Sequence, residues 1–197
     1  MGGKDPQGFW QYYAFENITV SFLIGDTPLT LLMYQPQYNL IERQVLMKKV
    51  NLFSTISHYR LDNQPHIQLL LQGHPTGRHL KGRELMDQFA SGQRYVLITS
   101  DDNPFDEVLH IYLLDLELNI LDEMDLSQPY TPGIYEHQHH YGERLEFTFF
   151  PEGLWCLEVR DQPKSKPLNF DHYPVRRPIK LWGQQYLRLH REHIQVA

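Results

Sequence analysis

The sequence predicts an all-β fold: a single-domain two-sheet sandwich or closed barrel of roughly ten antiparallel strands with one short helix. Three observations support this prediction. Apolar and polar residues alternate with a period of two along most of the chain. Turn-forming residues, chiefly Gly, Pro, Asn and Asp, separate the alternating runs at short intervals. The length of 197 residues suits one such domain and allows a core to form without disulfides.

The stretch from 94 to 126 carries the strongest strand signal. It contains three expected strands, at 95–99, 109–114 and 120–126, the last two joined by a hairpin turn at 115–119. In the strand 109–114 both faces are apolar or aromatic. We therefore expect this strand to lie in the middle of a sheet that is covered on both sides.

The sequence predicts less regular structure near the two ends of the chain. Residues 1–8 are expected to form a flexible tail, and residues 9–197 the single all-β domain. Four prolines in residues 161–178 predict a long irregular segment on the surface. Residues 186–196 fit either a strand or a short helix.

One short helix is predicted at residues 81–90. Leu85, Met86 and Phe89 would share one helical face, and Gly92 would end the helix. In a barrel, this helix would serve as a plug or lid.

Composition limits the function classes that we consider. The single Cys permits no internal disulfide, which is typical of a reducing compartment. The sequence shows no apolar leader segment and no apolar run of about 20 residues, the length of a spanning helix. The formal charge of −6 does not favour nucleic-acid binding. We expect a cytoplasmic protein that binds neither nucleic acid nor membrane.

An acidic loop follows the first of the three central strands. Asp101, Asp102, Asp106 and Glu107 make it a candidate binding surface for a partner, or a solvated loop that prevents an edge from pairing. Between Arg94 and Arg144 the sequence contains no Lys or Arg, whereas the chain after residue 160 is basic. Either the basic tail packs on the acidic part, or the two present separate surfaces.

A His-rich segment is the best candidate for metal chemistry. On a strand, His137 and His139 would share one face, and Glu143 follows closely. Two imidazoles and a carboxylate are suitable ligands for a divalent transition metal. The alternative is an exposed hairpin with solvated imidazoles.

This segment resembles part of the first cupin motif, in which HxH is followed by Glu and later by Gly. His137, His139, Glu143 and Gly153 carry the resemblance, which implies a metal site. The spacings from Gly133 to His137 and from Glu143 to Gly153 differ from the motif. No second motif supplies the later His.

We find none of the motifs GxSxG, GxGxxG, HExxH or CxxC, and we assign no catalytic residue. The residues that would bind an organic cofactor remain unknown, and none is required. The sequence favours a non-catalytic binding or scaffolding domain that recognises a protein partner or a small ligand. One alternative is a cupin-like metal-binding protein or metalloenzyme using His137 and His139. A second alternative is a barrel that carries an apolar ligand.

Overall fold

The structure, a computed structural model, describes residues 14–24, 27–37, 46–59, 65–103, 105–151, 153–167, 173–178 and 182–192. The chain divides into two compact units, Met1–Arg43 and Gln44–Ala197. This division differs from the predicted single domain over residues 9–197. The predicted tail, residues 1–8, lies outside the described residues.

The smaller unit contains one antiparallel hairpin, formed by β1 (Ala14–Ile24) and β2 (Thr27–Gln37). Ala14 lies opposite Gln37, and the register continues without a shift to the turn. The alternating residues that predicted strands here therefore do form strands.

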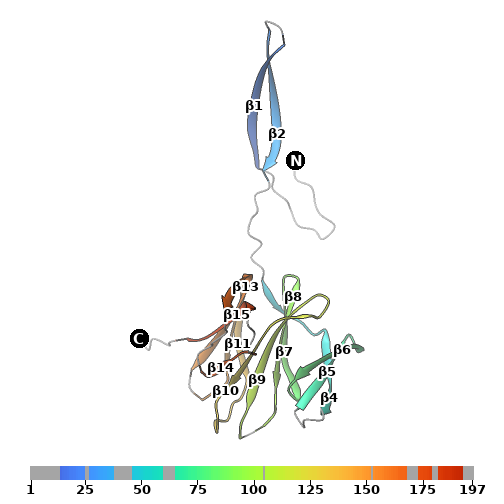
Figure 1. Cartoon of the computed structure of the whole chain (residues 1–197), viewed down its shortest axis with the longest axis vertical. Helices are drawn as coiled ribbons and strands as arrows, with labels where there is room; N and C mark the ends of the chain where they lie inside the picture. Colours follow the sequence, from blue (N-terminus) through green and yellow to red (C-terminus); the bar gives the residue numbers. More distant parts are fainter. Residues whose placement is uncertain are drawn as a thin grey trace. The chain divides into compact units, whose positions relative to one another are not determined.

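The larger unit consists of three antiparallel sheets, and its described residues contain no helix (Figure 1). Nothing in the described part of the chain is a helix long and apolar enough to cross a bilayer. The six-stranded sheet has the order β14-β10-β9-β8-β7-β3, the four-stranded sheet β11-β12-β13-β15, and the three-stranded sheet β4-β5-β6. The strands are β3 (Met47–Lys49), β4 (Phe53–Tyr59), β5 (Pro65–Leu71), β6 (His74–Lys81), β7 (Glu84–Ser91), β8 (Arg94–Ser100), β9 (Val108–Asp115), β10 (Ile120–Ser127), β11 (Glu136–Tyr141), β12 (Arg144–Thr148), β13 (Leu154–Pro167), β14 (Val175–Arg176) and β15 (Trp182–Glu192).

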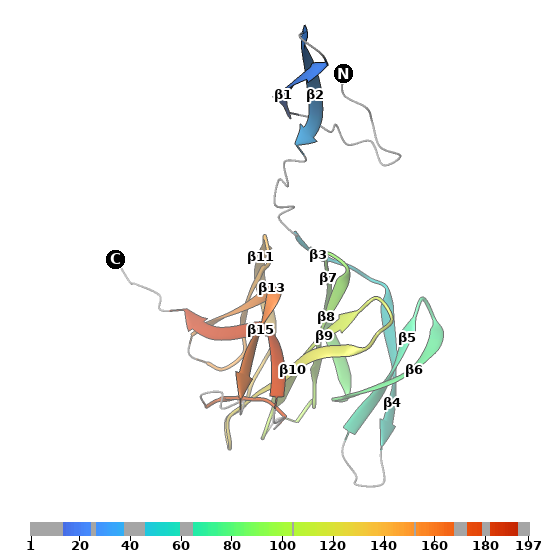
Figure 2. The ribbon, with the colours of Figure 1, turned by 45° about the horizontal axis from the view of Figure 1, so that its top comes forward.

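The six-stranded sheet lies between the other two sheets (Figures 1 and 2). Along β8, Val96 and Ile98 pack in one core with the four-stranded sheet, whereas Leu97 packs in a second core with the three-stranded sheet. Along β9, Ile111 and Tyr112 divide in the same way. The prediction that strand 109–114 is central and covered on both faces is confirmed.

The strands predicted at 95–99, 109–114 and 120–126 are confirmed as β8, β9 and β10. Each sheet runs from one edge strand to another in the described residues, so none closes into a barrel. The hypothesis of an apolar ligand inside a barrel therefore loses its structural basis.

The helix predicted at 81–90 is wrong. These residues form the end of β6, a turn, and most of β7. A β-bulge at Met86 explains the error, since Leu85 lies opposite Thr99 and Asp87 opposite Ile98. The extra residue changes the strand's alternation, so that its apolar residues take a spacing typical of a helix.

The irregular segment predicted at 161–178 is also partly wrong. Residues 161–167 continue β13, which pairs with β15 up to Pro167. Beyond Val159 this strand pairs with β15 alone among the described residues, and a register shift separates Val159 from Lys164. Proline lacks an N–H but is tolerated where one strand edge is unpaired. The undecided segment 186–196 is a strand as far as Glu192.

Asp122 of β10 joins the two sheets that form the first core. Its buried carboxylate accepts hydrogen bonds from the backbone N–H groups of Tyr186 and Leu187, both at 2.8 Å, and pairs with the buried guanidinium of Arg177. Arg177 also donates to the Leu187 carbonyl at 2.6 Å. The basic tail thus contacts the acidic meander here, as one of the two predicted arrangements requires.

Replacing Asp122 with Ala should be strongly destabilising. The substitution removes the carboxylate, so that Arg177 and two backbone N–H groups lose their partner inside the protein. We expect a loss of about 3–5 kcal/mol in the free energy of unfolding, measured by urea denaturation. As a control, Asp161→Asn alters a carboxylate whose side chain is 63% exposed and pairs with Arg94. It should cost less than about 1 kcal/mol. Equal losses in the two variants would contradict the role assigned to Asp122.

Candidate functional site

A β-bulge at Gln138 determines how the His-rich segment is displayed. In the β11–β12 hairpin, His137 lies opposite Phe147, but His139 lies opposite Glu146, so Gln138 is the extra residue. Phe147 is buried in the first core, whereas Glu146 is only partly buried. The bulge therefore places His137 and His139 on different faces, contrary to the prediction.

His140, rather than His139, is the partner of His137. His140 lies opposite the buried Leu145, on the same face as His137. Its Nδ1 is 3.1 Å from Nε2 of His137, and both rings pack against Phe89 with centroid distances of 5.5 Å. The structure thus forms an imidazole pair that strict alternation along the strand would not place together.

A buried carboxylate lies behind this pair. Asp87 of β7, with a side chain only 2% exposed, has its Oδ2 3.8 Å from Nδ1 of His137. The same carboxylate binds Nζ of Lys49 at 2.9 Å and accepts a hydrogen bond from the Tyr135 hydroxyl at 3.2 Å. On the other side of the His137 ring, Nε2 faces His140.

The pKa of His137 lies below its ordinary value. Burial is the main cause, and the nearby Lys49, His140 and His139 lower it further, while Asp87 opposes them. His137 is therefore predominantly neutral near pH 7, the state in which an imidazole binds metal.

The charged neighbours of Glu143 are Asp161 and Arg94 and not the histidines. Its pKa is raised, first by burial and then by the charge and hydrogen bond of Asp161, and Arg94 lowers it. Among the described residues, no cluster of three potential ligand atoms contains His137, His139 or Glu143. The structure therefore does not gather the three predicted ligands at one point.

The acidic loop is organised from within by Glu107. This buried carboxylate accepts hydrogen bonds from the Ser100 hydroxyl at 2.6 Å, the Asp102 N–H at 3.1 Å and the Asn103 N–H at 2.7 Å. Glu107 thus faces the loop's own backbone and is unsuited to direct contact with a partner.

Asp101 is bound to a buried imidazole. His110, 4% exposed, lies between two carboxylates, with Nε2 3.0 Å from Asp101 and Nδ1 2.7 Å from Asp125. Burial alone would lower the pKa of His110, but hydrogen bonds and charge from both carboxylates raise it above 6.5. Lys81 also pairs with Asp125, at 3.2 Å.

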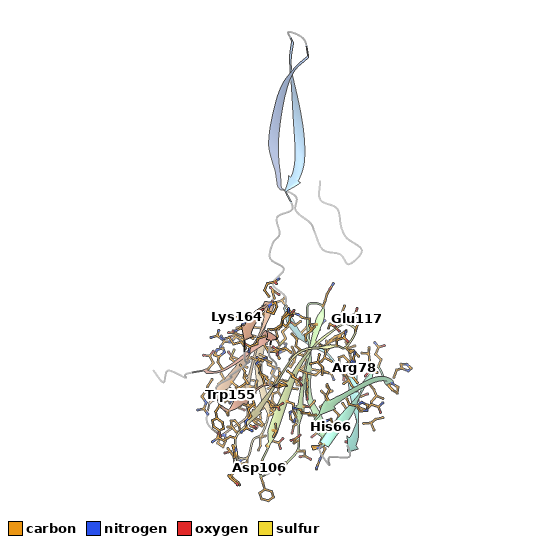
Figure 3. All side chains as sticks on the ribbon, in the orientation of Figure 1. His66, Arg78, Asp106, Glu117, Trp155 and Lys164 are labelled. Atoms are coloured by element: carbon orange, nitrogen blue, oxygen red, sulfur yellow. The ribbon has the colours of Figure 1, made fainter. Side chains whose placement is uncertain are left out.

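The remaining two acidic residues are exposed. Asp106 accepts a hydrogen bond from the Tyr130 N–H at 2.8 Å, which ties the acidic loop to the segment before β11. Figure 3 shows Asp106 and Glu117 at opposite ends of β9. Of the four predicted surface residues, Asp102 and Asp106 present their carboxylates to solvent.

An open pocket of about 510 Å³ lies beside β11. On one side of the pocket, Gly133 packs directly against the ring of Phe149. Only glycine allows this close approach, because a Cβ at position 133 would come within 2.6 Å of a ring carbon. Sequence reasoning missed this pocket, although the Pro-Gly break at 132–133 marks one wall. Six of the residues that line it are Ile134, Glu136, Gln138, Phe149, Phe150 and Leu154.

The chain has no match among family models, curated proteins or solved structures.

The Asp101–His110–Asp125 triad gives a pH-dependent prediction. Because folding raises the pKa of His110, its contribution to stability is fully present below pH 6.5 and is lost as pH rises through the folded pKa. Urea denaturation at several pH values should show that His110→Gln costs most at or just below pH 6.5 and less at alkaline pH.

Strong acid gives a second check, because protonation of Asp125, whose pKa is lowered, also weakens the triad. A difference between wild type and His110→Gln that stays constant or grows from pH 6.5 upward would contradict the assigned charge state.

Proposed function

We propose that the chain is a non-catalytic binding domain that recognises a protein partner through the pocket beside β11. The observation that carries this proposal is the pocket itself, which is lined by apolar residues together with a few polar ones. Phe149, Phe150 and Leu154 provide apolar walls, while Glu136 and Gln138 provide hydrogen-bonding groups. Such a combination is typical of binding sites for side chains and small molecules.

Exposed apolar side chains adjoin the pocket. Ile134 lines it and is 72% exposed, and Tyr130, four residues earlier in the same segment, is 91% exposed. Large apolar side chains close together at the surface favour a binding role. The segment 130–134 would be covered when a partner inserts an apolar side chain.

The acidic residues near the pocket indicate which residues should flank the partner's apolar side chain. Asp106 is hydrogen-bonded to the backbone of Tyr130, so the acidic loop lies next to the exposed segment. Asp102 and Asp106 are exposed, and Glu136 lines the pocket. We therefore propose a partner segment with a large apolar residue flanked by Lys or Arg. A small apolar cation is the alternative occupant.

We also propose a two-sheet sandwich architecture and a cytoplasmic location. The packing of the four-stranded sheet on the six-stranded sheet over one core supports a two-sheet sandwich, with the three-stranded sheet as a further layer. The single Cys supports a cytoplasmic location.

Metal binding at the His-rich segment is the second candidate function. The 3.1 Å separation of His137 Nε2 and His140 Nδ1 favours it, since two ligands of one metal lie at similar distances. Asp87 would act as the outer carboxylate that commonly orients a metal-bound imidazole. In this version of the cupin-like hypothesis, His140 takes the place of His139.

Selection of linear peptides on the full chain tests the first proposal. The selected peptides should share a large apolar residue next to Lys or Arg. Ile134→Asp should weaken their binding at least about tenfold, or about 1.4 kcal/mol, in a fluorescence titration. Asp102→Asn with Asp106→Asn should weaken binding less and reduce its dependence on salt.

A matched control is Ile56→Asp on β4, because Ile56 is also exposed, at 53%, but does not line the pocket. Ile56→Asp should bind like the wild type. Peptides that bind the wild type and Ile134→Asp equally well would rule out the pocket. Binding of small apolar cations without any selected peptide would favour the small-ligand alternative.

Zinc titration followed by NMR of the imidazole nitrogens tests the second candidate. Signals of His137 and His140 should shift together, and His140→Gln should abolish the shift of His137. The control His139→Gln should leave it in place, because the bulge directs His139 to the other face. If zinc leaves both signals unchanged, the pair is only a hydrogen-bonded contact.

A further inference from the structure

The outer face of the four-stranded sheet contains a second cluster of potential ligands, distinct from the histidine pair. Glu146, Cys156 and His190 lie side by side across β12, β13 and β15, because Cys156 is the register partner of both others. Glu158 is two residues further along β13 and therefore shares this face. Figure 3 labels Trp155, the residue before Cys156, on the same sheet.

The cluster offers three kinds of ligand atom at close range. One atom each from Cys156, Glu158 and His190 lies within 4.8 Å of the other two. In a tetrahedral zinc site, bonds of about 2.3 Å to sulfur and about 2.0 Å to nitrogen or oxygen put ligand atoms roughly 3.5 Å apart. Small side-chain rotations would bring the three atoms to that distance. Cys156 is buried, and the other two residues are only partly exposed.

The state of His190 is an independent indication of a ligand. Its Nδ1 is buried and has no hydrogen-bond partner among the described residues. Its Nε2 lies 3.5 Å from Oε1 of Glu192. When a carboxylate accepts the proton of one ring nitrogen, the other nitrogen keeps a lone pair, which is the arrangement found behind metal-bound histidines. A buried nitrogen without a partner is destabilising, and a metal would relieve this cost.

The surrounding charges leave room for a divalent cation. Arg144 pairs with Glu146 and Glu192, and Arg188 pairs with Glu158 at 3.2 Å. Two guanidinium groups therefore face three carboxylates. Once the thiol is ionised, a divalent ion would balance the four negative groups.

We propose that Cys156, Glu158 and His190 bind a divalent transition metal such as zinc, with one coordination position left for water or an exogenous ligand. Binding forms the metal–sulfur bond as the S–H bond breaks, and the thiol proton passes to solvent. Glu192 is a positioning residue that acts through His190.

Cobalt(II) titration of the full chain, monitored by absorption, tests this proposal. The chain has one Cys, so a sulfur-to-cobalt charge-transfer band can arise only from Cys156. We expect this band together with the visible bands of tetrahedral cobalt, and zinc should displace both. Cobalt bound by His137 and His140 would give no sulfur band, which separates the two sites.

Variants assign the other ligands. His190→Gln should weaken cobalt binding at least tenfold, and Glu192→Gln should weaken it by about 10–100-fold, as for other outer carboxylates. The matched control His74→Gln, which changes an exposed histidine on β6, should retain the band at full affinity. Circular dichroism checks that each variant is folded. Absence of the sulfur band in the wild type, or a band unaffected by His190→Gln, would overturn the proposal, whatever the outcome of peptide binding.

Discussion

The burial of β8 and β9 on both faces is the constraint on which the larger unit depends. Both strands have a neighbour on each side, and each face of their sheet is covered by another sheet. Any polar side chain on them must therefore be satisfied inside the protein. Thr99 donates to the Lys81 carbonyl at 2.6 Å, and His110 is bound by two carboxylates. This arrangement ties the acidic loop and β10 to the middle of the sheet.

The candidate sites lie where this constraint is relaxed. The four-stranded sheet has one face in the first core and one face outward, and β11 is its edge strand in the described part of the chain. The pocket adjoins β11, the histidine pair belongs to it, and the cysteine cluster lies on the outward face. A rigid middle layer thus supports an outer layer that carries most of the candidate chemistry.

Alternation of residues was sufficient to predict the central strands β8, β9 and β10, although β10 also contains a bulge, at Leu121. It failed in two other strands that contain an extra residue. The bulge at Met86 made β7 resemble a helix, and the bulge at Gln138 placed His140 beside His137 instead of His139. A local period cannot reveal an insertion that is defined only by the neighbouring strand.

The candidate ligands were predictable only in part for a related reason. His137 was found from local spacing, but Cys156 and His190 are distant in the sequence and meet through the register of β13 with β15. Asp87 was part of the expected helix, so its position behind His137 could not be anticipated. Burial of Glu107 depends on the fold of its own loop, and the sequence pattern placed it with the exposed carboxylates.

The bulge at Gln138 also has a consequence for self-association. A flat, regular edge strand offers a row of backbone groups on which a second copy of the chain can add, and this addition is a common start of aggregation. An extra residue twists the strand and interrupts the even spacing of those groups. The irregularity that selects which imidazoles meet thus also makes β11 a poorer template for strand addition than a regular strand would be.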